Sequence, residues 1–278
     1  MIIKPSEIKT SQFHAYLLGA IAPRPICFAS TIDADGNPNL SPFSFFNIFG
    51  SKPPIAIFSP ARRVRDNTIK HTLENIYDTK EVVINVVNYA MVQQMSLSSC
   101  EFPKGISEFE KAGFTPVAST LVKPFRVKES PAQLECKVLE VKETGVEGGA
   151  GNLIICEIVM MHINDDVLND LQQIDPHKID LVARMGGDYY CRASGSAVFE
   201  VAKPNMQLGM GFDALPAKIK NSHVLTGNHL GQLANCTTIP QRDEAFVVSN
   251  HTDMESQAIQ YLDHHDVESA WQVLLRML

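Results

Sequence analysis

The stretch LSPFSFFNIFGSKPPIAIFSP, residues 40–60, combines features that seldom occur together. Its phenylalanines stand among serines and an asparagine, and a Pro-Pro corner then leads into the short apolar run PIAIF. A fully buried strand does not need the serines and the asparagine, and a surface loop does not favour the phenylalanines. We therefore expect this stretch to form a wall that is both apolar and able to form hydrogen bonds.

Apolar runs of strand length surround this stretch. They are rich in Val, Ile and Phe and are bounded by Gly, Pro, Asp or Asn, a pattern typical of β-strands. The predicted strands are residues 25–31, 54–58, 81–87, 133–144 and 152–163. The turns 33–39 and 145–152 place Gly where a positive φ is needed and predict hairpins. Antiparallel strands with few helices predict a barrel rather than a doubly wound sheet.

Helical patterns are fewer before residue 200. Residues 67–79 carry Ile69, Leu73 and Ile76 at helical spacing, with Asn67 or Thr68 as the expected N-cap. Shorter helices are expected within 89–99 and 107–114.

The character of the chain changes at 203–216, a connector with two Pro and two Gly. We expect a barrel domain over 1–203 and a helical extension over 204–278, with helices in 226–235 and 266–278. In the last helix, Val267, Ala270, Trp271 and Leu274 share one apolar face. That face is expected to pack on the barrel or on a second subunit.

Composition excludes several classes of protein. The 278 residues include 24 basic and 31 acidic ones, and the net charge of −7 gives no general attraction to nucleic acid or to a membrane surface. No membrane-spanning run or signal peptide is recognisable, and the six cysteines form no C-x-x-C pair. We expect a cytoplasmic protein. Residues 263–266 form at most a weak metal site, so no metal is expected.

A second polar stretch, SPARRVRDNTIKHT at 59–72, suggests where an anion binds. Hydroxyls, cations and the free N–H groups of a helix start are what a phosphate monoester requires. The alternative is a solvated rim of arginines with threonines that only cap the helix. A phosphate site beside an aromatic wall fits a phosphorylated planar ligand, and flavin mononucleotide (FMN) is the obvious candidate. The candidate ligand residues in this stretch are Ser59, Arg62, Asn67, Thr68, Lys70 and Thr72.

Residues 23–60, 65–87 and 183–192 together resemble the flavin reductase-like family of FMN-binding split barrels, which includes flavoredoxin. The similarity covers roughly residues 10–200. It implies a homodimer of six-stranded Greek-key split barrels with noncovalent FMN near the subunit interface. The family's K-D-T phosphate motif corresponds to Lys70, His71 and Thr72, with His71 in place of Asp.

The resemblance also implies which residues approach the flavin. Ser44, Phe45, Phe46 and Asn47 would line the isoalloxazine, with backbone amides near N5 and O4. Ser30 and Thr31 would lie near the ribityl chain.

For three further side chains the sequence allows either a ligand contact or a structural role. Arg184, in RMGGDYY, either faces the ligand or holds a turn. Arg24 either contacts the flavin or forms a salt bridge at the barrel end, and Asn85 favours a structural hydrogen bond over a ligand contact.

The chain carries no recognised hydrolase, P-loop, metalloprotease or Rossmann motif. A flavin enzyme needs no acid–base pair of its own, because the cofactor accepts the hydride. We therefore expect no catalytic side chain, reduction of FMN by NADH or NADPH, and electron transfer to a small molecule or a protein. The alternatives are an FMN electron carrier or sensor without NAD(P)H oxidase activity, and a split barrel that binds pyridoxamine phosphate.

Overall fold

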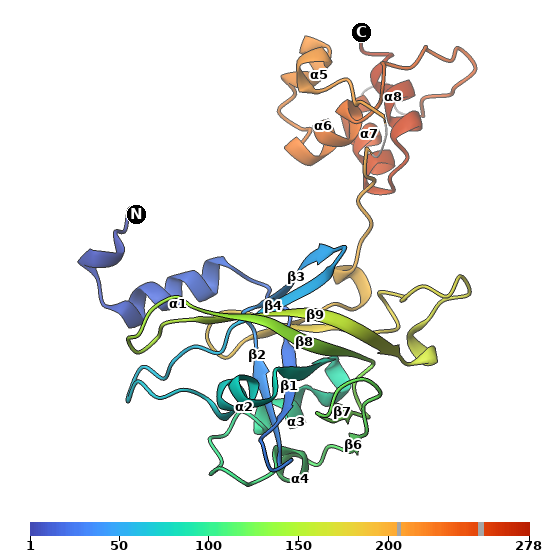
Figure 1. The fold of residues 1–278 in the computed structure, drawn as a ribbon. Helices are drawn as coiled ribbons and strands as arrows, with labels where there is room; N and C mark the ends of the chain where they lie inside the picture. The colour runs from blue at the N-terminus through green and yellow to red at the C-terminus, as the bar shows by residue number, and fades with distance from the viewer. Residues whose placement is uncertain (205–206, 250–252) are drawn as a thin grey trace. The chain divides into compact units, whose positions relative to one another are not determined.

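Two compact units make up the chain in the computed structural model, Met1–Phe199 and Glu200–Leu278 (Figure 1). The structure describes residues 1–204, 207–249 and 253–278, so part of the expected connector, 205–206, lies outside the described residues. Within the described residues no helix has the length and apolar character to cross a membrane.

The first unit is built on a seven-stranded sheet in which every pair of neighbours is antiparallel, in the order β2-β1-β5-β8-β9-β4-β3. The five predicted strands and both hairpins are confirmed, and the fold is mainly β with accessory helices. The strands are β1 (Cys27–Ile32), β2 (Pro38–Phe43), β3 (Phe46–Ser51), β4 (Pro54–Phe58), β5 (Glu81–Val86), β8 (Ala132–Glu143) and β9 (Asn152–Ile163).

The sheet has seven strands rather than the expected six, and the Greek-key order stays a prediction. The stretch 40–60 provides most of β2 and all of β3 and β4. Ser41, Asn47 and Ser51 are strand residues because β2 pairs with β1 and β3 with β4. Tertiary pairing here outweighs local propensity.

Helices and two short hairpins surround this sheet, and α2 packs against β1 and β2 while α3 and α4 pack against β2. The predicted helices within 89–99 and 107–114 are confirmed. The elements are α1 (Thr10–Ala20), α2 (His71–Thr79), α3 (Val92–Leu97), α4 (Glu108–Ala112), β6 (Pro116–Val117) paired with β7 (Arg126–Val127), and β10 (Val182–Arg184) paired with β11 (Tyr190–Arg192). The 3₁₀ turns are η1 (Pro5–Glu7), η2 (Tyr89–Met91), η3 (Asp165–Val167), η4 (Gly195–Ala197) and, in the second unit, η5 (Phe212–Ala214).

Helix α2 starts at His71, so the predicted start at 67 and the predicted caps Asn67 and Thr68 are wrong. Asn67 has a φ of 57°, in the left-handed region, which no residue of a right-handed helix adopts. The residue at the N-cap position is Lys70, whose side chain makes no capping hydrogen bond. The polar stretch is therefore a loop that ends in a helix rather than the helix itself.

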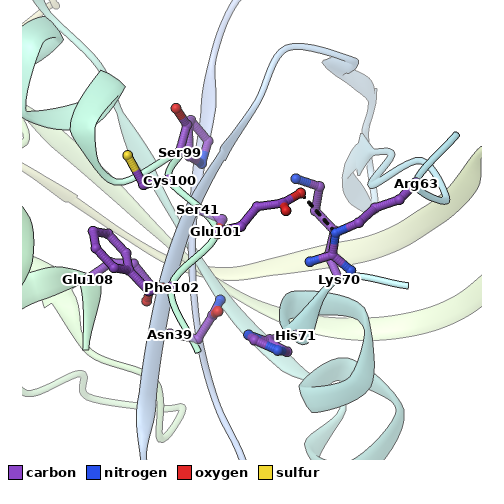
Figure 2. A pocket seen from close by; sticks show the side chains of 11 residues that line it. Asn39, Ser41, Arg63, Lys70, His71, Ser99, Cys100, Glu101, Phe102 and Glu108 are labelled. Atoms are coloured by element: carbon purple, nitrogen blue, oxygen red, sulfur yellow. Dashed lines mark hydrogen bonds and ion pairs between the residues drawn. The ribbon is translucent and has the colours of Figure 1, made fainter. Parts of the chain in front are cut away.

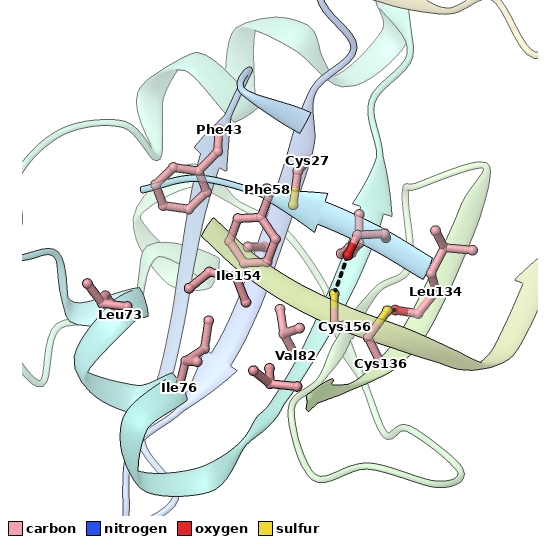
Figure 3. Close-up of a cluster of buried hydrophobic side chains, with 14 residues drawn as sticks. Cys27, Phe43, Phe58, Leu73, Ile76, Val82, Leu134, Cys136, Ile154 and Cys156 are labelled. Carbon is pink, nitrogen blue, oxygen red and sulfur yellow. Dashed lines mark hydrogen bonds between the residues drawn. The ribbon is translucent and has the colours of Figure 1, made fainter. Parts of the chain in front are cut away.

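Strand β1 is buried on both faces and separates two hydrophobic clusters. The cluster inside the sheet includes Phe43, Phe58, Leu73 and Ile76, so α2 closes that side (Figure 3). The opposite face of β1 contributes Phe28 to a second cluster with residues of α3 and α4. Alternation of side chains along the strand explains this division.

Three buried cysteines, Cys27, Cys136 and Cys156, belong to the inner cluster (Figure 3). The thiol of Cys156 donates to the carbonyl of Ala56 at 3.3 Å. Burial raises the pKa of Cys27, and the contact with Cys156 followed by burial raises that of Cys136. All six cysteines of the chain are free, and Cys100 is exposed. The buried thiols therefore behave as small apolar side chains.

The second unit is helical and has its own core around Trp271. The two helices predicted from periodicity are confirmed. Its helices are α5 (Ala217–Lys220), α6 (Gly227–Ala234), α7 (Met254–Asp263) and α8 (Val267–Leu274).

The apolar face of α8 is covered within this unit, because Trp271 and Leu274 are fully buried in one cluster with Leu233 of α6 and Leu262 of α7. The expectation that this face packs on the barrel or on a second subunit is therefore wrong. Packing of the extension as a whole on the barrel or a partner stays a prediction.

Candidate functional site

A small cavity lies where the loop before α2 meets β2 and the loop after α3 (Figure 2). Its volume is about 40 Å³. Judged by the space that one water needs, this is room for a few waters or a phosphoryl group. The charged or titratable side chains around it include Arg63, Lys70, His71, Glu101 and Glu108.

Glu101 orients two arginines of the loop. Arg63 donates from Nε to one carboxylate oxygen at 3.0 Å, and Arg65 donates to the other. The hydrogen bonds from Arg65 and then from Arg63 lower the pKa of Glu101. An ionised carboxylate therefore already satisfies part of the positive charge of this loop.

Lys70 is the cation of this cavity that has no carboxylate within ion-pair distance in the described part of the chain. Burial lowers its pKa, the charge on Arg63 adds to this, and Glu101 opposes it. The first turn of α2, whose leading N–H groups have no intrahelical acceptor, begins at the next residue. This arrangement suits an anion.

Glu108 forms a buried wall of the same cavity and is only 4% exposed. One of its carboxylate oxygens accepts the N–H of Leu40 at 2.9 Å. Burial raises the pKa of Glu108, while the bond from Leu40 and the nearby His71 lower it. Because its ionised form is disfavoured, this carboxyl opposes a bound anion less than an exposed carboxylate would.

A second cavity, of about 320 Å³, adjoins the first, because Pro42 and Ser99 line both. The two neighbouring cavities together are called the groove. One wall is the end of β2 with Ser44, a second is α3, and a third is the β10–β11 hairpin with Arg184 and Tyr190. The mixture of apolar and hydroxyl side chains is typical of a small-molecule site.

A third cavity, of about 390 Å³, adjoins the second on the side of the β10–β11 hairpin. Four residues line both of these cavities: Ser96, Arg184, Asp188 and Tyr190. The three cavities therefore follow one another from Lys70 along α3 to the β10–β11 hairpin.

Arg24 is a buried positioning residue. Its guanidinium donates to the carbonyls of Leu18 at 2.7 Å, Ile21 at 2.6 Å and Met185 at 2.9 Å, and reaches the hydroxyl of Ser44 at 3.4 Å. Burial lowers its pKa, and the charge on Arg184 adds to this. Among the described residues no carboxylate pairs with it, so the salt-bridge reading is wrong, and a flavin contact stays a prediction.

Three of the predicted ligand residues line the groove: Lys70 in the first cavity, and Ser44 and Arg184 in the second. Arg184 also donates to the carbonyl of Gly187 at 2.6 Å, so the reading that it holds a turn is confirmed, whereas its contact with a ligand stays a prediction.

The side chains that follow Ser44 point elsewhere. Phe46 packs against the inner cluster, Asn47 is exposed and accepts the N–H of Ile48, and Phe45 lies edge-on to the His14 ring. Successive residues of a strand point to opposite faces, so four consecutive side chains cannot line one surface. The predicted contacts of their backbone amides stay predictions.

Four further candidates hold the loop before α2 in place. Arg62 donates to the side chain of Asn67 at 2.7 Å and to its carbonyl at 2.8 Å, and Asn67 donates to Val146. Thr68 donates to Asp66 at 2.6 Å, and Ser59 accepts the N–H of Asn152. These residues support the loop that carries Arg63 and Lys70, and they do not line the first cavity.

Thr31 and Thr72 are fully buried in a polar network, not at a cavity surface. Asn39 donates to Thr72 at 2.9 Å and Asn75 donates to Thr31 at 3.1 Å. Ser30 is also fully buried, and its hydroxyl has no partner among the described residues. The three predicted hydroxyl ligands thus lie beneath the site.

The structural reading of Asn85 is confirmed. Its amide donates to the carbonyl of Phe28 at 2.9 Å and accepts the N–H of Val127 at 2.8 Å. This side chain ties β5 to β1 and to β7.

Several site residues could not be predicted from local sequence. Ser99 and Glu101 follow α3, Glu108 begins α4, and Asp188 and Tyr190 belong to the distant hairpin. No motif marks Ser99, Glu101 or Glu108. Asp188 and Tyr190 belong to the RMGGDYY element, but only the tertiary fold brings that element to β2 and the loop before α2.

Within the described residues, no three His, Cys, Asp or Glu side chains are arranged to bind a metal ion. At 263–266, Asp263 lies 3.4 Å from His229, and Nδ1 of His264 lies 2.8 Å from the carbonyl of Gln260.

Comparison with known proteins places this geometry in a family. The family model for the flavin reductase like domain matches residues 19–177. An uncharacterised protein of Aquifex aeolicus is 38% identical over 200 residues, which are 72% of this chain and 98% of that protein.

Two solved structures are similar. The nitrilotriacetate monooxygenase component B of Bacillus cereus has a TM-score of 0.67 and 26% identity, covering 72% of this chain and 98% of that one. A protein of Shewanella frigidimarina with a split barrel domain has a TM-score of 0.61 and 28% identity, covering 73% of this chain and 100% of that one. The chain therefore belongs to the flavin reductase-like family of split-barrel proteins.

Proposed function

We propose that the protein is a flavin-binding oxidoreductase that holds FMN noncovalently in the groove formed by the first and second cavities. The observation that carries this proposal is that a cation-lined cavity adjoins a larger one, with Pro42 and Ser99 lining both. Family membership supports the flavin, and the small first cavity supports the phosphorylated form.

The residues present fit such a cofactor. Lys70 offers a cation without a paired carboxylate in the described chain, and the first N–H groups of α2 begin beside it. The second cavity offers Pro42 and Met95 to the faces of a ring, and the hydroxyls of Ser44 and Ser96 to its polar edge. Both requirements of the ligand, a charged end and a flat apolar body with polar edges, have counterparts in the groove.

When bound, FMN supplies a ring that accepts a hydride. The protein's own residues bind and orient it. Lys70 and Arg63 hold the phosphate, and Arg24 joins Ser44 to the carbonyl of Met185, thereby connecting two walls of the groove. NADH or NADPH is the donor in this proposal. Neither an acid–base pair nor a metal is required of the protein.

A homodimer is the assembly that the surface favours. Strand β3 lies at an edge of the sheet, and its Ile48 and Phe49 are 57% and 64% exposed. An exposed apolar edge strand is a pairing surface that proteins generally cover. In this proposal a second copy covers it, and Phe49→Asp gives a monomer in light scattering after size exclusion.

Lys70→Ala tests the flavin assignment. Loss of a charge-assisted hydrogen bond weakens FMN binding about 10- to 100-fold. Riboflavin, which lacks the phosphate, binds the variant and the wild type equally. Flavin fluorescence titration measures both affinities, and Lys137→Ala, at an exposed position of β8, is the control.

Equal loss of both ligands, or of neither, contradicts a phosphate at Lys70. Steady-state NADH and NADPH consumption with added FMN tests the oxidoreductase itself, because a protein that only carries electrons consumes almost none.

A further inference from the structure

The third cavity adjoins the groove proposed for FMN, with Arg184 and Tyr190 among the residues that line both, and lies between a helical face and a hairpin. Tyr89, Val92, Gln93 and Ser96 come from η2 and α3 at spacings of three, four and seven residues, so they form one face. The opposite side is the β10–β11 hairpin. At about 390 Å³ the cavity is large enough for a molecule with one or two rings.

Two arginines lie over tyrosine rings around this cavity. The guanidinium carbon of Arg192 is 3.8 Å from the centre of the Tyr89 ring, and that of Arg184 is 4.6 Å from the centre of the Tyr190 ring. All four residues line the cavity. A guanidinium held in this way offers a planar, positively charged surface to a ligand ring.

The two arginines differ in how fully their charge is satisfied. Arg192 donates to both carboxylate oxygens of Asp180, at 2.7 and 2.8 Å. Arg184 lies 3.7 Å from Asp188, whose side chain is fully exposed, and such a pair contributes little. Arg184 is thus the cation that remains available to an anion, whereas Arg192 with Tyr89 forms a neutralised flat surface.

Arg184 also marks the boundary with the second cavity, because it lines both. An anionic group on Arg184 would lie next to the flavin groove, with the rest of the ligand in the third cavity. A cationic ligand is disfavoured by the charge on Arg184. A carboxylate matches the forked geometry of arginine, and an aromatic ring matches the flat Tyr89–Arg192 surface.

We propose that the third cavity binds an aromatic carboxylate, with its carboxylate on Arg184 and its ring against the Tyr89–Arg192 pair. That this ligand is a second substrate of the flavin site rests on the proposed function; the binding site itself does not.

Calorimetric titration of flavin-free protein with 2-naphthoate tests the site, with 2-naphthamide as the neutral twin. Wild type binds 2-naphthoate more tightly than 2-naphthamide. Arg184→Met weakens 2-naphthoate about 10- to 100-fold, as loss of a charge-assisted hydrogen bond does, and changes 2-naphthamide less than about 2-fold. Arg184→Lys keeps the charge and restores part of the preference.

The ring surface has its own variant. Tyr89→Ala weakens both probes about 2- to 10-fold, because a ring contact does not depend on ligand charge. Arg242→Met, which removes an arginine paired with Glu244 in the second unit, changes neither. Thermal melting checks that each variant is folded. If Arg184→Met is not folded, Arg184→Lys alone tests whether Arg184 binds the carboxylate.

Equal affinity of wild type for the two probes, or no binding of 2-naphthoate, overturns the proposal. So does displacement of 2-naphthoate by FMN, which would assign this cavity to the flavin. Binding of 2-naphthoate by a protein that does not bind FMN would contradict the proposed function and leave this site standing.

Discussion

The barrel unit, Met1–Phe199, and the helical unit, Glu200–Leu278, differ in what they bury. Among the described residues the helical unit buries two polar side chains, Gln257 and Gln272. The barrel unit buries many more: Arg24, Ser30, Thr31, Asn39, Ser59, Thr72, Asn75, Asn85, Ser98, Glu108, Ser130, Gln133, Glu135 and Asn152.

This difference indicates that the polar groups buried in the barrel unit serve its site, whereas the core of the helical unit serves stability alone. Buried polar groups are costly unless they are hydrogen-bonded, so a fold keeps them where they position something. In the barrel unit, Arg24 and Glu108 stand at the walls of the groove, and Asn39 joins it to the network beneath. The helical unit has an apolar core that requires no such network.

Leu274→Ala should have the largest effect and should be confined to the helical unit. Leu274 is fully buried, and truncation of such a side chain costs about 2–5 kcal/mol of unfolding free energy. Trp271 is the one tryptophan of the chain, so its fluorescence during denaturation follows this unit.

Amide hydrogen exchange of β8 and β9 should not change in this variant, because each hydrophobic cluster draws its members from a single unit. Loss of protection in those strands would mean that the units unfold together. Leu278→Ala, at a 58% exposed position, is the control.

Glu135→Gln should have an intermediate effect in the barrel unit. The fully buried carboxylate accepts the N–H groups of Thr120 at 2.8 Å, Leu121 at 2.6 Å and Val122 at 3.2 Å, and lies 2.7 Å from His162. Removing one acceptor oxygen leaves buried donors unpaired, which costs about 1–3 kcal/mol. Denaturation followed by circular dichroism measures this loss.

The loss should depend on pH. Burial is the largest influence on the pKa of Glu135 and raises it, but the hydrogen bonds together outweigh burial, so the pKa lies below its ordinary 4.5. A lowered folded pKa stabilises the protein above the unfolded pKa, and this stabilisation disappears as pH falls through the folded value. The difference between wild type and variant should therefore shrink in acid. Glu140→Gln, exposed on the same strand, should show no such trend.

Tyr77→Phe should have the smallest effect, because its hydrogen bond is exposed. The hydroxyl donates to Glu143 at 2.6 Å, and the loss should be about 0.5–1 kcal/mol. Burial first, and then Glu143, raises the pKa of Tyr77 from 10 to about 12. The contribution of the protonated Tyr77 hydroxyl to the free energy of unfolding is therefore complete below pH 10 and is lost as pH rises toward about 12.

Urea denaturation of wild type and Tyr77→Phe at pH 7 and pH 11 measures this small difference. A loss as large as that of Glu135→Gln would show that burial is not what distinguishes the two polar contacts.

Periodicity predicted the elements that bury a clear apolar pattern. Strands β4 and β9 have the predicted bounds, and α8 was recognised from the spacing around Trp271. Helix α1 was missed because its apolar residues are not concentrated on one face, and none of its residues is buried. The start of α2 was placed too early because the bond from Asn67 to the carbonyl of Val146, which helps to hold the loop, depends on tertiary structure.

The candidate site was predicted in outline only. Lys70 was recognisable because a run of cations and hydroxyls precedes a helix, and Ser44 because of the aromatic stretch around it. The hydroxyls of Thr31 and Thr72 had the right chemistry but the wrong exposure, and burial by Asn39 and Asn75 is not visible in the local sequence.

The positions of the cysteines allow thiol modification to report how fast the barrel unit opens. A thiol reagent added to the native protein should modify Cys100 first, because it is exposed. Modification of Cys27, Cys136 and Cys156 should wait for opening of the sheet, since their sulfurs lie in its inner cluster. The rate at which these three buried thiols are labelled would therefore measure opening of the barrel unit, while the fluorescence of Trp271 reports on the helical unit.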